Sequence, residues 1–206
     1  MTKRYDRAYF DRWYRDPARR VIAPAALARK VAMVVAVAEF QLARPIRNML
    51  DVGCGEGSWR APLRRLRPGV EYVGVDPSAY AAARFGRTRN VHLGTLAELP
   101  LVEEAMEAAP FDLVVCADVL QYLPGGQVVV GLGHLEGVLG GLAFIEAYTS
   151  VDALEGDRRD WHRRSGATYD RLFRAAGLVH CGLHCWVTAA VAKTTTEMER
   201  GRIARA

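Results

Sequence analysis

The stretch LDVGCGEGSW, from Leu50 to Trp59, indicates the fold of this chain. An apolar run leads into glycines at positions 53, 55 and 57, and a helical pattern follows. This order predicts a strand, a tight loop and a helix. Glycine tolerates positive φ and has no side chain, so such a loop lets the backbone approach a bound ligand closely.

Two carboxylates stand beside this loop at the ends of predicted strands. Asp51 precedes the glycines, and Asp76 ends the next apolar run, residues 70–76. Open α/β sheets hold their ligands at the carboxyl ends of the strands, and an acid at the tip of the second strand can accept the ribose hydroxyls of a cofactor. The sequence therefore predicts a nucleoside-containing cofactor at this edge of the sheet.

The spacing of the glycines distinguishes two cofactor classes. Dinucleotide-binding loops have the pattern G-x-G-x-x-G, whereas this chain has G-x-G-x-G with an acid two residues before the first glycine. This pattern, with Asp76 following, resembles the first motif of the class I S-adenosylmethionine-dependent methyltransferases. Residues 111–123 and 138–150 resemble the fourth strand with its following helix and the glycine turn with the fifth strand. The resemblance covers residues 50–150.

The resemblance implies an α/β fold, a three-layer α-β-α Rossmann-like sandwich around a mostly parallel seven-stranded sheet with an antiparallel edge strand. We expect residues 1–206 to form a single domain, with an N-terminal helical cap segment (1–45), a Rossmann-like core (46–192) and a C-terminal tail (193–206). The chain is long enough to bury one full core, and half of its residues are hydrophobic.

Composition bears on compartment and partners. The 28 basic and 23 acidic residues give a net charge of +5, and the arginines are spread along the chain, which favours a solvated surface over a nucleic-acid-binding face. Residues 1–14 lack the apolar core of a signal peptide, and residues 31–38 are far too few to span a membrane. The four cysteines fall in predicted strands or at their ends, as buried thiols do in a reducing compartment. We expect a cytoplasmic protein without a membrane partner.

The resemblance implies S-adenosyl-L-methionine as the cofactor, bound at the ends of the predicted strands. Where the family contacts adenine, commonly with an acid, this chain has Thr95, so we expect backbone groups and the Leu96 side chain to make this contact. Asp118 follows the fourth strand, where it can cap the next helix, face the ligand, or do both. The predicted cofactor-binding residues are Asp51, Gly53, Cys54, Gly55, Gly57, Asp76, Pro77, Thr95, Leu96, Ala117 and Asp118.

Aromatic side chains indicate a substrate pocket. Tyr5, Tyr9 and Trp13 fall four residues apart and share one helical face, which suits either packing or capping of the site. The polar segment 151–165, which contains Trp161, follows the predicted fifth strand and is a candidate lid. The predicted substrate-binding residues are Tyr9, Trp13, Tyr14, Gln121, Tyr122 and Trp161.

Methyl transfer from a sulfonium mainly requires that cofactor and acceptor atom are held in line at short distance. An acceptor that must lose a proton also needs a base, and His has the most suitable unperturbed pKa. His162, in the candidate lid, is therefore a catalytic candidate, with a surface His among arginines as the alternative interpretation. Glu146 and Tyr148 are further candidates because they fall near the predicted cleft.

The absence of one motif argues against a nucleic-acid base as the molecule that receives the methyl group. Family members that act on nucleic-acid bases often carry Asn/Asp-Pro-Pro-aromatic after the fourth strand, whereas this chain has Ala-Asp-Val-Leu at residues 117–120. We expect a small-molecule acceptor, methylated on oxygen, nitrogen or a carboxylate, and name Arg15, Arg159 and Arg163 as candidates for orienting an anionic group. The alternatives are a binding or regulatory protein that keeps this fold without turnover, and a nicotinamide-dependent oxidoreductase, which the glycine spacing disfavours.

Two histidines and two cysteines lie close together in residues 178–187. Alternation places His180 and His184 on one face of a predicted edge strand. Cys181 and Cys185 fall on the other face, so the four side chains cannot converge on one tetrahedral ion. The sequence therefore predicts a plain edge strand and no metal site.

Overall fold

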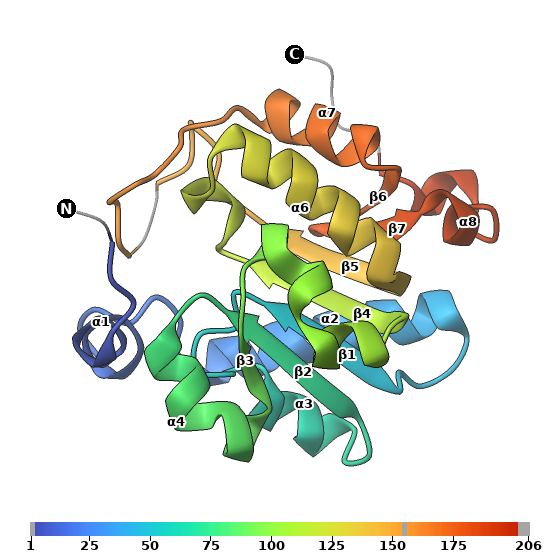
Figure 1. Cartoon of the computed structure of the whole chain (residues 1–206). Coiled ribbons are helices and arrows are strands. Elements are labelled where there is room, and N and C mark those ends of the chain that lie inside the picture. The colour runs from blue at the N-terminus through green and yellow to red at the C-terminus, as the bar shows by residue number, and fades with distance from the viewer. Residues whose placement is uncertain (1–2, 154–155, 202–206) are drawn as a thin grey trace.

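The computed structural model describes residues 3–153 and 156–201. In these ranges a seven-stranded sheet has the strand order β3-β2-β1-β4-β5-β7-β6. The strands are β1 (Asn48–Val52), β2 (Glu71–Asp76), β3 (Val91–Leu93), β4 (Phe111–Ala117), β5 (Leu139–Glu146), β6 (Leu178–Gly182) and β7 (Cys185–Thr188). Helices cover both faces of this sheet, so the molecule has three layers (Figure 1).

The helices divide between the two faces according to the apolar side chains that they bury. One layer consists of α2 (Pro24–Leu42), α3 (Arg60–Leu66) and α8 (Ala189–Ala192), and the other of α5 (Glu103–Glu107), α6 (Gly125–Val138) and α7 (Gly166–Ala175). Strand β4 serves both layers, because Leu113 and Val115 pack with α2 while Val114 packs with α6. A near-continuous apolar run is what such a central parallel strand requires.

The parallel pairing brings the carboxyl ends of four strands to one edge of the sheet. Strand β1 pairs in parallel with β2 and β4, and Ala117 at the end of β4 lies opposite Glu146 at the end of β5. Helix α1 (Arg7–Phe10) and the π-helix η1 (Asp11–Arg15) lie at this edge, beside the start of α4 (Ala79–Arg89) (Figure 1). Ligand sites in open α/β sheets form at this edge.

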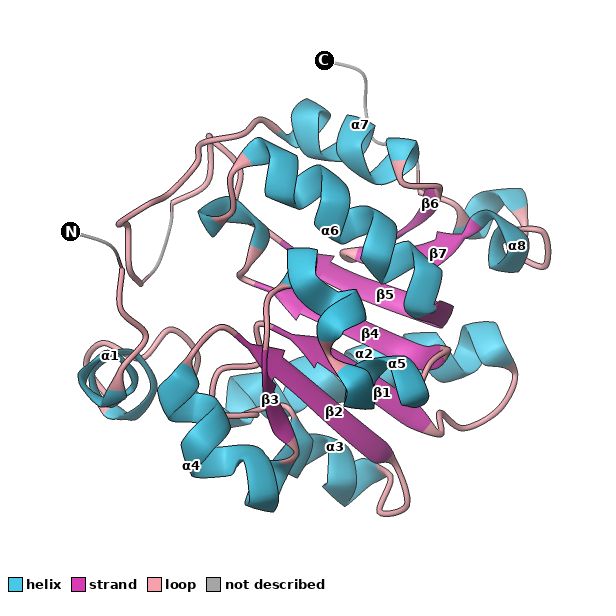
Figure 2. Ribbon diagram, viewed as in Figure 1, coloured by secondary structure: helices cyan, strands magenta, loops and turns pink. Residues whose placement is uncertain are grey.

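This arrangement confirms the predicted fold class, and its antiparallel strand is β7. Strand β7 pairs antiparallel with both β5 and β6, so it lies next to the edge strand β6 (Figure 2). The prediction of one edge strand over residues 178–187 is wrong, because Leu183 and His184 have φ values of 49° and 62° and turn the chain into a hairpin. Two residues with positive φ give the turn whose twist matches paired strands. The usual Asn-Gly signal for this turn is absent from the sequence.

The predicted N-terminal cap segment divides into two parts. Helix α2 buries Val31, Val34 and Ala38 against the sheet, as its helical apolar period requires, whereas residues 3–22 lie at the carboxyl edge. The predicted lid, residues 151–165, and tail, residues 193–206, each include positions outside the described residues. The described part of the tail contains the short 3-10 helix η4 (Glu197–Glu199).

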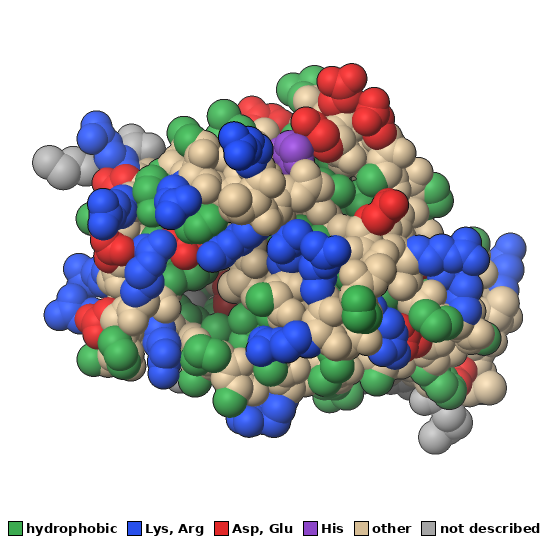
Figure 3. All heavy atoms as spheres, turned by 90° about the horizontal axis from the view of Figure 1, so that it is seen from below, with side chains coloured by type: hydrophobic (Ala, Val, Ile, Leu, Met, Phe, Trp, Pro, Cys, Tyr) green, Lys and Arg blue, Asp and Glu red, His purple; other side chains and the backbone are tan. Residues whose placement is uncertain are grey.

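The described surface carries mixed side chains. Lys and Arg spread over the face seen from below, where they surround a hollow; Asp and Glu form a cluster at one edge and also lie among the basic side chains at the opposite edge (Figure 3). All four cysteines are free, and three of them are buried. Within the described ranges, none of the helices combines the length and the apolar character needed to cross a bilayer.

Candidate functional site

The predicted glycine loop follows β1 directly and bends as expected. Gly53, Gly55 and Gly57 have φ values of 71°, 56° and 71°. A Cβ on Gly53 would overlap the side chain of Val119, and one on Gly55 would overlap the ring of Tyr14. Any other L residue at these two positions would be both strained and blocked. The loop is therefore shaped for close approach of other groups to its backbone.

Asp76 ties this loop to the end of β2. Its Oδ2 accepts a hydrogen bond from the Gly55 N–H at 2.7 Å, and its Oδ1 accepts one from the Ser78 N–H at 2.9 Å. Burial raises the pKa of the Asp76 carboxyl, and the two backbone donors act against this rise. Since a carboxylate offers about four acceptor positions, roughly half remain for a ligand.

Asp51 lies at the end of β1 and is 2% exposed. Its Oδ2 accepts a hydrogen bond from the Tyr72 hydroxyl at 2.8 Å. Burial raises the pKa of Asp51 to about 7, while the Tyr72 hydroxyl lowers it. Burial also raises the pKa of the neighbouring Cys54 thiol well above its usual range. Cys54 therefore stays protonated and is a poor nucleophile.

A cavity of about 610 Å³ opens beside the loop at the carboxyl edge. This volume lies in the range of small-molecule sites. Its walls come from the N-terminal segment, α2, α3 and the ends of β1, β4 and β5. Twelve of the predicted site residues line it: Tyr9, Trp13, Tyr14, Asp51, Gly53, Cys54, Ala117, Asp118, Gln121, Tyr122, Glu146 and Tyr148. The fold thus brings together residues predicted for cofactor binding, substrate binding and catalysis.

The aromatic side chains of the N-terminal segment divide between the core and the cavity wall. Phe10 is 1% exposed and packs against Ala81 and Phe85 of α4, whereas Tyr9 and Trp13 line the cavity. Three polar pairs hold the segment in place: Ser78 with the Tyr5 carbonyl, Arg15 with Glu56, and Lys3 with Asp157. Glu56 belongs to the glycine loop itself, so the segment is fastened directly over the candidate cofactor site.

Several predicted residues do not reach the cavity lining. They include Gly55 and Gly57 of the loop and Asp76, which supports the loop. Pro77 is exposed just before α4, and Trp161 lies in the polar segment 151–165. The His162 side chain is exposed, and only its backbone N–H, which donates to the Gln121 carbonyl at 2.8 Å, links it to the site.

Of the groups predicted to contact adenine, the Leu96 side chain is placed differently from expectation. Leu96 begins the 3-10 helix η2 (Leu96–Leu101), is 2% exposed, and packs against Gly131 of α6. Its side chain therefore belongs to the apolar core and does not face the cleft. The Thr95 hydroxyl donates to Glu98 at 2.9 Å. The prediction that the Leu96 side chain contacts adenine is therefore wrong, because this side chain packs in the core. The local sequence does not reveal this packing.

The three predicted anion-binding arginines are engaged elsewhere. Arg15 pairs with Asp11 and Glu56, Arg159 pairs with Asp157, and Arg163 donates to the Ser150 carbonyl at 2.9 Å. None of the three lines the cavity, whereas Arg65 of α3 does.

Lys30 and Asp157 are cavity residues that the sequence reasoning missed. Lys30 Nζ lies 2.6 Å from Glu146 Oε2. Lys30 follows Leu27 by three residues and precedes Val34 by four, so its position on the inward face of α2 was readable from the helical period. Asp157, which is 6% exposed, lies in a segment whose apolar residues have no regular spacing, so the sequence did not indicate that it would be buried.

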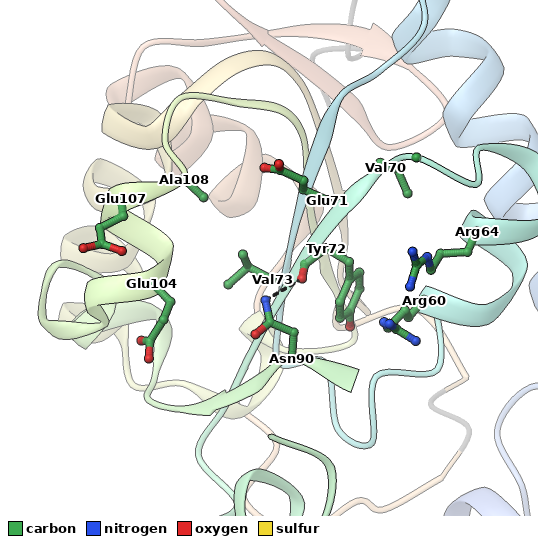
Figure 4. A pocket seen from close by; sticks show the side chains of 11 residues that line it. Arg60, Arg64, Val70, Glu71, Tyr72, Val73, Asn90, Glu104, Glu107 and Ala108 are labelled. Carbon is green, nitrogen blue, oxygen red and sulfur yellow. Dashed lines mark hydrogen bonds between the residues drawn. The ribbon is translucent and has the colours of Figure 1, made fainter. Parts of the chain in front are cut away.

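A second hollow, of about 560 Å³, lies at the amino end of β2. It exists because β3 pairs only with residues 74–76 and leaves the edge of residues 71–73 uncovered. Asn90 Nδ2 donates to the Tyr72 carbonyl there at 2.8 Å, and Arg60 and Arg64 lie across from Glu104 and Glu107 (Figure 4). Among the described residues, no buried polar side chain without a partner lines this hollow. The cavity at the carboxyl edge is therefore the candidate site.

Metal chemistry finds no support in the described part of the chain. No group of three or more His, Cys, Asp or Glu side chains there could hold an ion. His180 and Cys181 lie on β6, His184 lies in the turn, and Cys185 begins β7.

Comparisons with known proteins agree with this geometry. A family model described as a methyltransferase domain matches residues 50–140. Ubiquinone biosynthesis O-methyltransferases are 36% identical, over 102 residues in Bradyrhizobium sp. (strain ORS 278) and over 78 in Rhodopseudomonas palustris (strain TIE-1). The matches cover 48% and 37% of this chain, and 38% and 30% of those proteins. The chain thus matches only about a third of the length of these curated relatives.

Solved structures share the fold at low sequence identity. The sugar N-methyltransferase KedS8 from Streptoalloteichus sp. ATCC 53650 has a TM-score of 0.65 at 19% identity, over 87% of this chain and 92% of that one. The magnesium protoporphyrin IX methyltransferase of Synechocystis PCC 6803, with bound S-adenosylhomocysteine, has a TM-score of 0.54 at 19% identity, over 84% and 86%. These structures confirm the fold that the resemblance implied, and the domain match supports the family inferred from the glycine loop and the strand segments.

Proposed function

Because the chain carries a methyltransferase domain and has the class I methyltransferase fold, we propose that it is an enzyme that binds S-adenosylmethionine and methylates a small molecule. The observation that carries this proposal is the glycine loop, residues 53–57, which borders a cavity lined by both polar and aromatic side chains. Solved relatives with bound S-adenosylmethionine or S-adenosylhomocysteine support the choice of cofactor.

The residues present fit this cofactor. Gly53 and Gly55 allow other groups to lie against their backbone, since a Cβ would overlap Val119 at Gly53 and Tyr14 at Gly55. We expect Tyr14 to move away from Gly55 when the cofactor binds. Asp76 orients the loop through the Gly55 N–H and keeps acceptor positions for ribose hydroxyls. When bound, the cofactor supplies an electrophilic methyl group, which the acceptor's lone pair takes in line with the leaving sulfur, so that S-adenosylhomocysteine is the second product.

Glu146 is the base that the geometry favours. Lys30 holds its Oε2 at 2.6 Å, while Oε1 makes no hydrogen bond within the described part of the chain. An acceptor hydroxyl or ammonium group in the cavity can therefore pass its proton to Oε1. Tyr148 also lines the cavity and is a second candidate, whereas the exposed side chain of His162 is not required for this step.

The acceptor atom is oxygen, nitrogen or a carboxylate oxygen of a small molecule. The curated relatives are named as O-methyltransferases and one solved relative as a sugar N-methyltransferase, so both chemistries occur among similar proteins. The aromatic side chains of Tyr9, Trp13 and Trp59 give the cavity apolar walls for the body of such a molecule.

Calorimetric titration with S-adenosylmethionine, S-adenosylhomocysteine and NAD tests the cofactor. Micromolar binding of the two adenosyl compounds, without binding of NAD, is expected. Asp76→Ala should weaken this binding, with Asp170→Ala on helix α7, which does not line the cavity, as the control. Absence of binding to the unaltered protein would overturn the proposal. Binding without methyl transfer to any acceptor would favour a regulatory protein that keeps the fold without turnover.

A further inference from the structure

Gln121 has a buried amide that the protein itself leaves without hydrogen bonds. It lies in the short 3-10 helix η3 (Leu120–Tyr122), directly after β4. Its side chain is 0% exposed, yet it lines the cavity beside Ala117 and Asp118. Neither Oε1 nor Nε2 makes a hydrogen bond of ordinary length and angle with the residues that the structure describes. The amide lies close enough to the Tyr122 hydroxyl to act against the rise in pKa that burial causes there.

Two hydrogen bonds fix the backbone around Gln121. The Gln121 carbonyl accepts the His162 N–H at 2.8 Å, and the Leu120 carbonyl accepts Arg164 Nη1 at 2.9 Å. Buried polar side chains in folded proteins are nearly always paired, and an unpaired one costs free energy. A buried amide kept unpaired on a cavity wall is therefore explained most simply by a ligand that pairs with it.

The Gln121 amide and its polar neighbours in the cavity wall indicate what this ligand must bring. The Tyr122 hydroxyl already donates to the Asp157 carbonyl, and Lys30 is paired with Glu146. Glu146 Oε1 and Gln121 Oε1 remain as acceptors, so the ligand needs donors, while Gln121 Nε2 needs an acceptor.

We propose that Gln121 determines acceptor specificity, and that the methyl acceptor presents to it a hydrogen-bond donor beside a hydrogen-bond acceptor. A vicinal diol, an amino alcohol and a carboxamide each have this arrangement. This inference rests on the proposed methyl transfer and deepens it by naming the chemistry of the acceptor. Sites built to hydrogen-bond a substrate group reject an analogue that lacks it by roughly 10⁴-fold, because buried partners are then left unpaired.

The variant Gln121→Leu tests this role, with Gln127→Leu on the exposed face of α6 as the matched control. Leu has a similar volume and removes the unpaired amide, so the melting temperature of the free protein should stay equal or rise. The dissociation constant for S-adenosylhomocysteine should stay within about twofold of that of the unaltered protein. A lower melting temperature, or a tenfold loss of S-adenosylhomocysteine affinity, would show that the amide serves the fold or the cofactor, and would overturn the proposal.

Acceptor selectivity completes the test. A panel of diols, amino alcohols and carboxamides, each paired with an analogue that lacks one of the two groups, is incubated with S-adenosylmethionine, and release of S-adenosylhomocysteine is measured. The complete member of a pair should be preferred at least 100-fold in kcat/KM, and Gln121→Leu should reduce this preference to within about threefold by raising KM. Equal use of both members, or turnover only of compounds without the donor and acceptor pair, would overturn the role of Gln121. Failure of the unaltered protein to bind S-adenosylhomocysteine would instead overturn the proposed function.

Discussion

Lys30 Nζ lies 2.6 Å from Glu146 Oε2, and this ion pair joins helix α2 to the carboxyl end of β5 inside the cavity. The two side chains are 25% and 22% exposed, so water screens their attraction and the pair contributes at most about 1 kcal/mol to stability. An ion pair with so small a structural effect can hold a carboxylate in place for catalysis. Its removal should therefore change the rate of methyl transfer far more than the free energy of unfolding.

Glu146→Gln is expected to lower kcat by roughly 10²- to 10⁴-fold with acceptors that lose a proton, since Gln cannot take that proton. The free energy of unfolding should change by no more than about 1 kcal/mol. Steady-state kinetics and urea unfolding measure the two effects. Asp170→Asn, which alters the exposed pair of Asp170 with Arg174, is the control and should leave kcat unchanged. An unaltered kcat in Glu146→Gln would exclude Glu146 as the base.

Asp51 should make the protein less stable as the pH rises. Its pKa is raised from the ordinary 3.8 to about 7 by burial, so the folded state holds this proton more tightly than the unfolded state does. The free energy of unfolding therefore falls between about pH 4 and pH 7. The variant Asp51→Asn lacks the titrating carboxyl and should not lose stability in this way. The difference in free energy of unfolding between Asp51→Asn and the unaltered protein should therefore grow from pH 4 to pH 7, and should be on the order of 4 kcal/mol larger at pH 8 than at pH 4.

Urea unfolding at several pH values checks this sign. Asp112→Asn is a control with the opposite sign, because Arg44 lowers the pKa of Asp112 and the carboxylate stabilises the folded state above its unfolded pKa. That variant should be less stable at neutral pH, with a difference that shrinks as the pH falls below about 4. Curves for Asp51→Asn that run parallel to those of the unaltered protein from pH 4 to pH 8 would contradict the raised pKa of Asp51.

Two glycines of α6 should respond to alanine in opposite directions. A Cβ on Gly131 would lie 2.5 Å from Leu96 Cγ, whereas a Cβ on Gly133 would meet nothing within 4 Å. Gly131→Ala should lose about 1 to 2 kcal/mol of unfolding free energy, because overpacking outweighs the gain in helix propensity. Gly133→Ala should gain about 0.5 to 1 kcal/mol. Thermal and urea unfolding distinguish the two, and a stable Gly131→Ala would argue against the buried position of Leu96.

The glycine loop and the central strand β4 could be predicted from the sequence because both depend on local rules. Positive φ requires glycine at Gly53 and Gly55, and a strand buried on both faces requires an apolar run such as that of β4. The pairing of Lys30 with Glu146 joins residues 116 positions apart, and no local pattern specifies such a contact.

Two residues that were predicted at the site, His162 and Leu96, do not line the cavity, and in both cases contacts between distant segments decide their placement. His162 was named because histidine is a suitable base, but the path of the polar segment decides whether its side chain reaches the cavity. Leu96 was named from a family position, and packing against Gly131 placed it in the core. The chemistry of a residue is readable from its type, whereas its placement depends on contacts made by distant segments.

Tyr14 covers the backbone that a cofactor must reach. A Cβ on Gly55 would overlap both the ring and the hydroxyl of Tyr14, and the next residue, Arg15, is paired with Glu56 of the same loop. We therefore expect S-adenosylhomocysteine to approach Gly55 only when Tyr14 has moved, and the molecules in which Tyr14 covers Gly55 to be closed to it. Such a closed population reduces the apparent affinity and slows association.

Tyr14→Ala should therefore raise the association rate constant for S-adenosylhomocysteine by roughly three- to tenfold. Trp13 and Trp59 line the cavity, so stopped-flow measurement of tryptophan fluorescence can follow binding. Tyr14→Phe keeps the ring over Gly55 and should bind at the original rate, and Phe40→Ala, at a side chain that is exposed on α2, controls for loss of an aromatic residue elsewhere. If Tyr14→Ala binds no faster than the unaltered protein, Tyr14 does not limit access, and the cofactor reaches the loop from its other side.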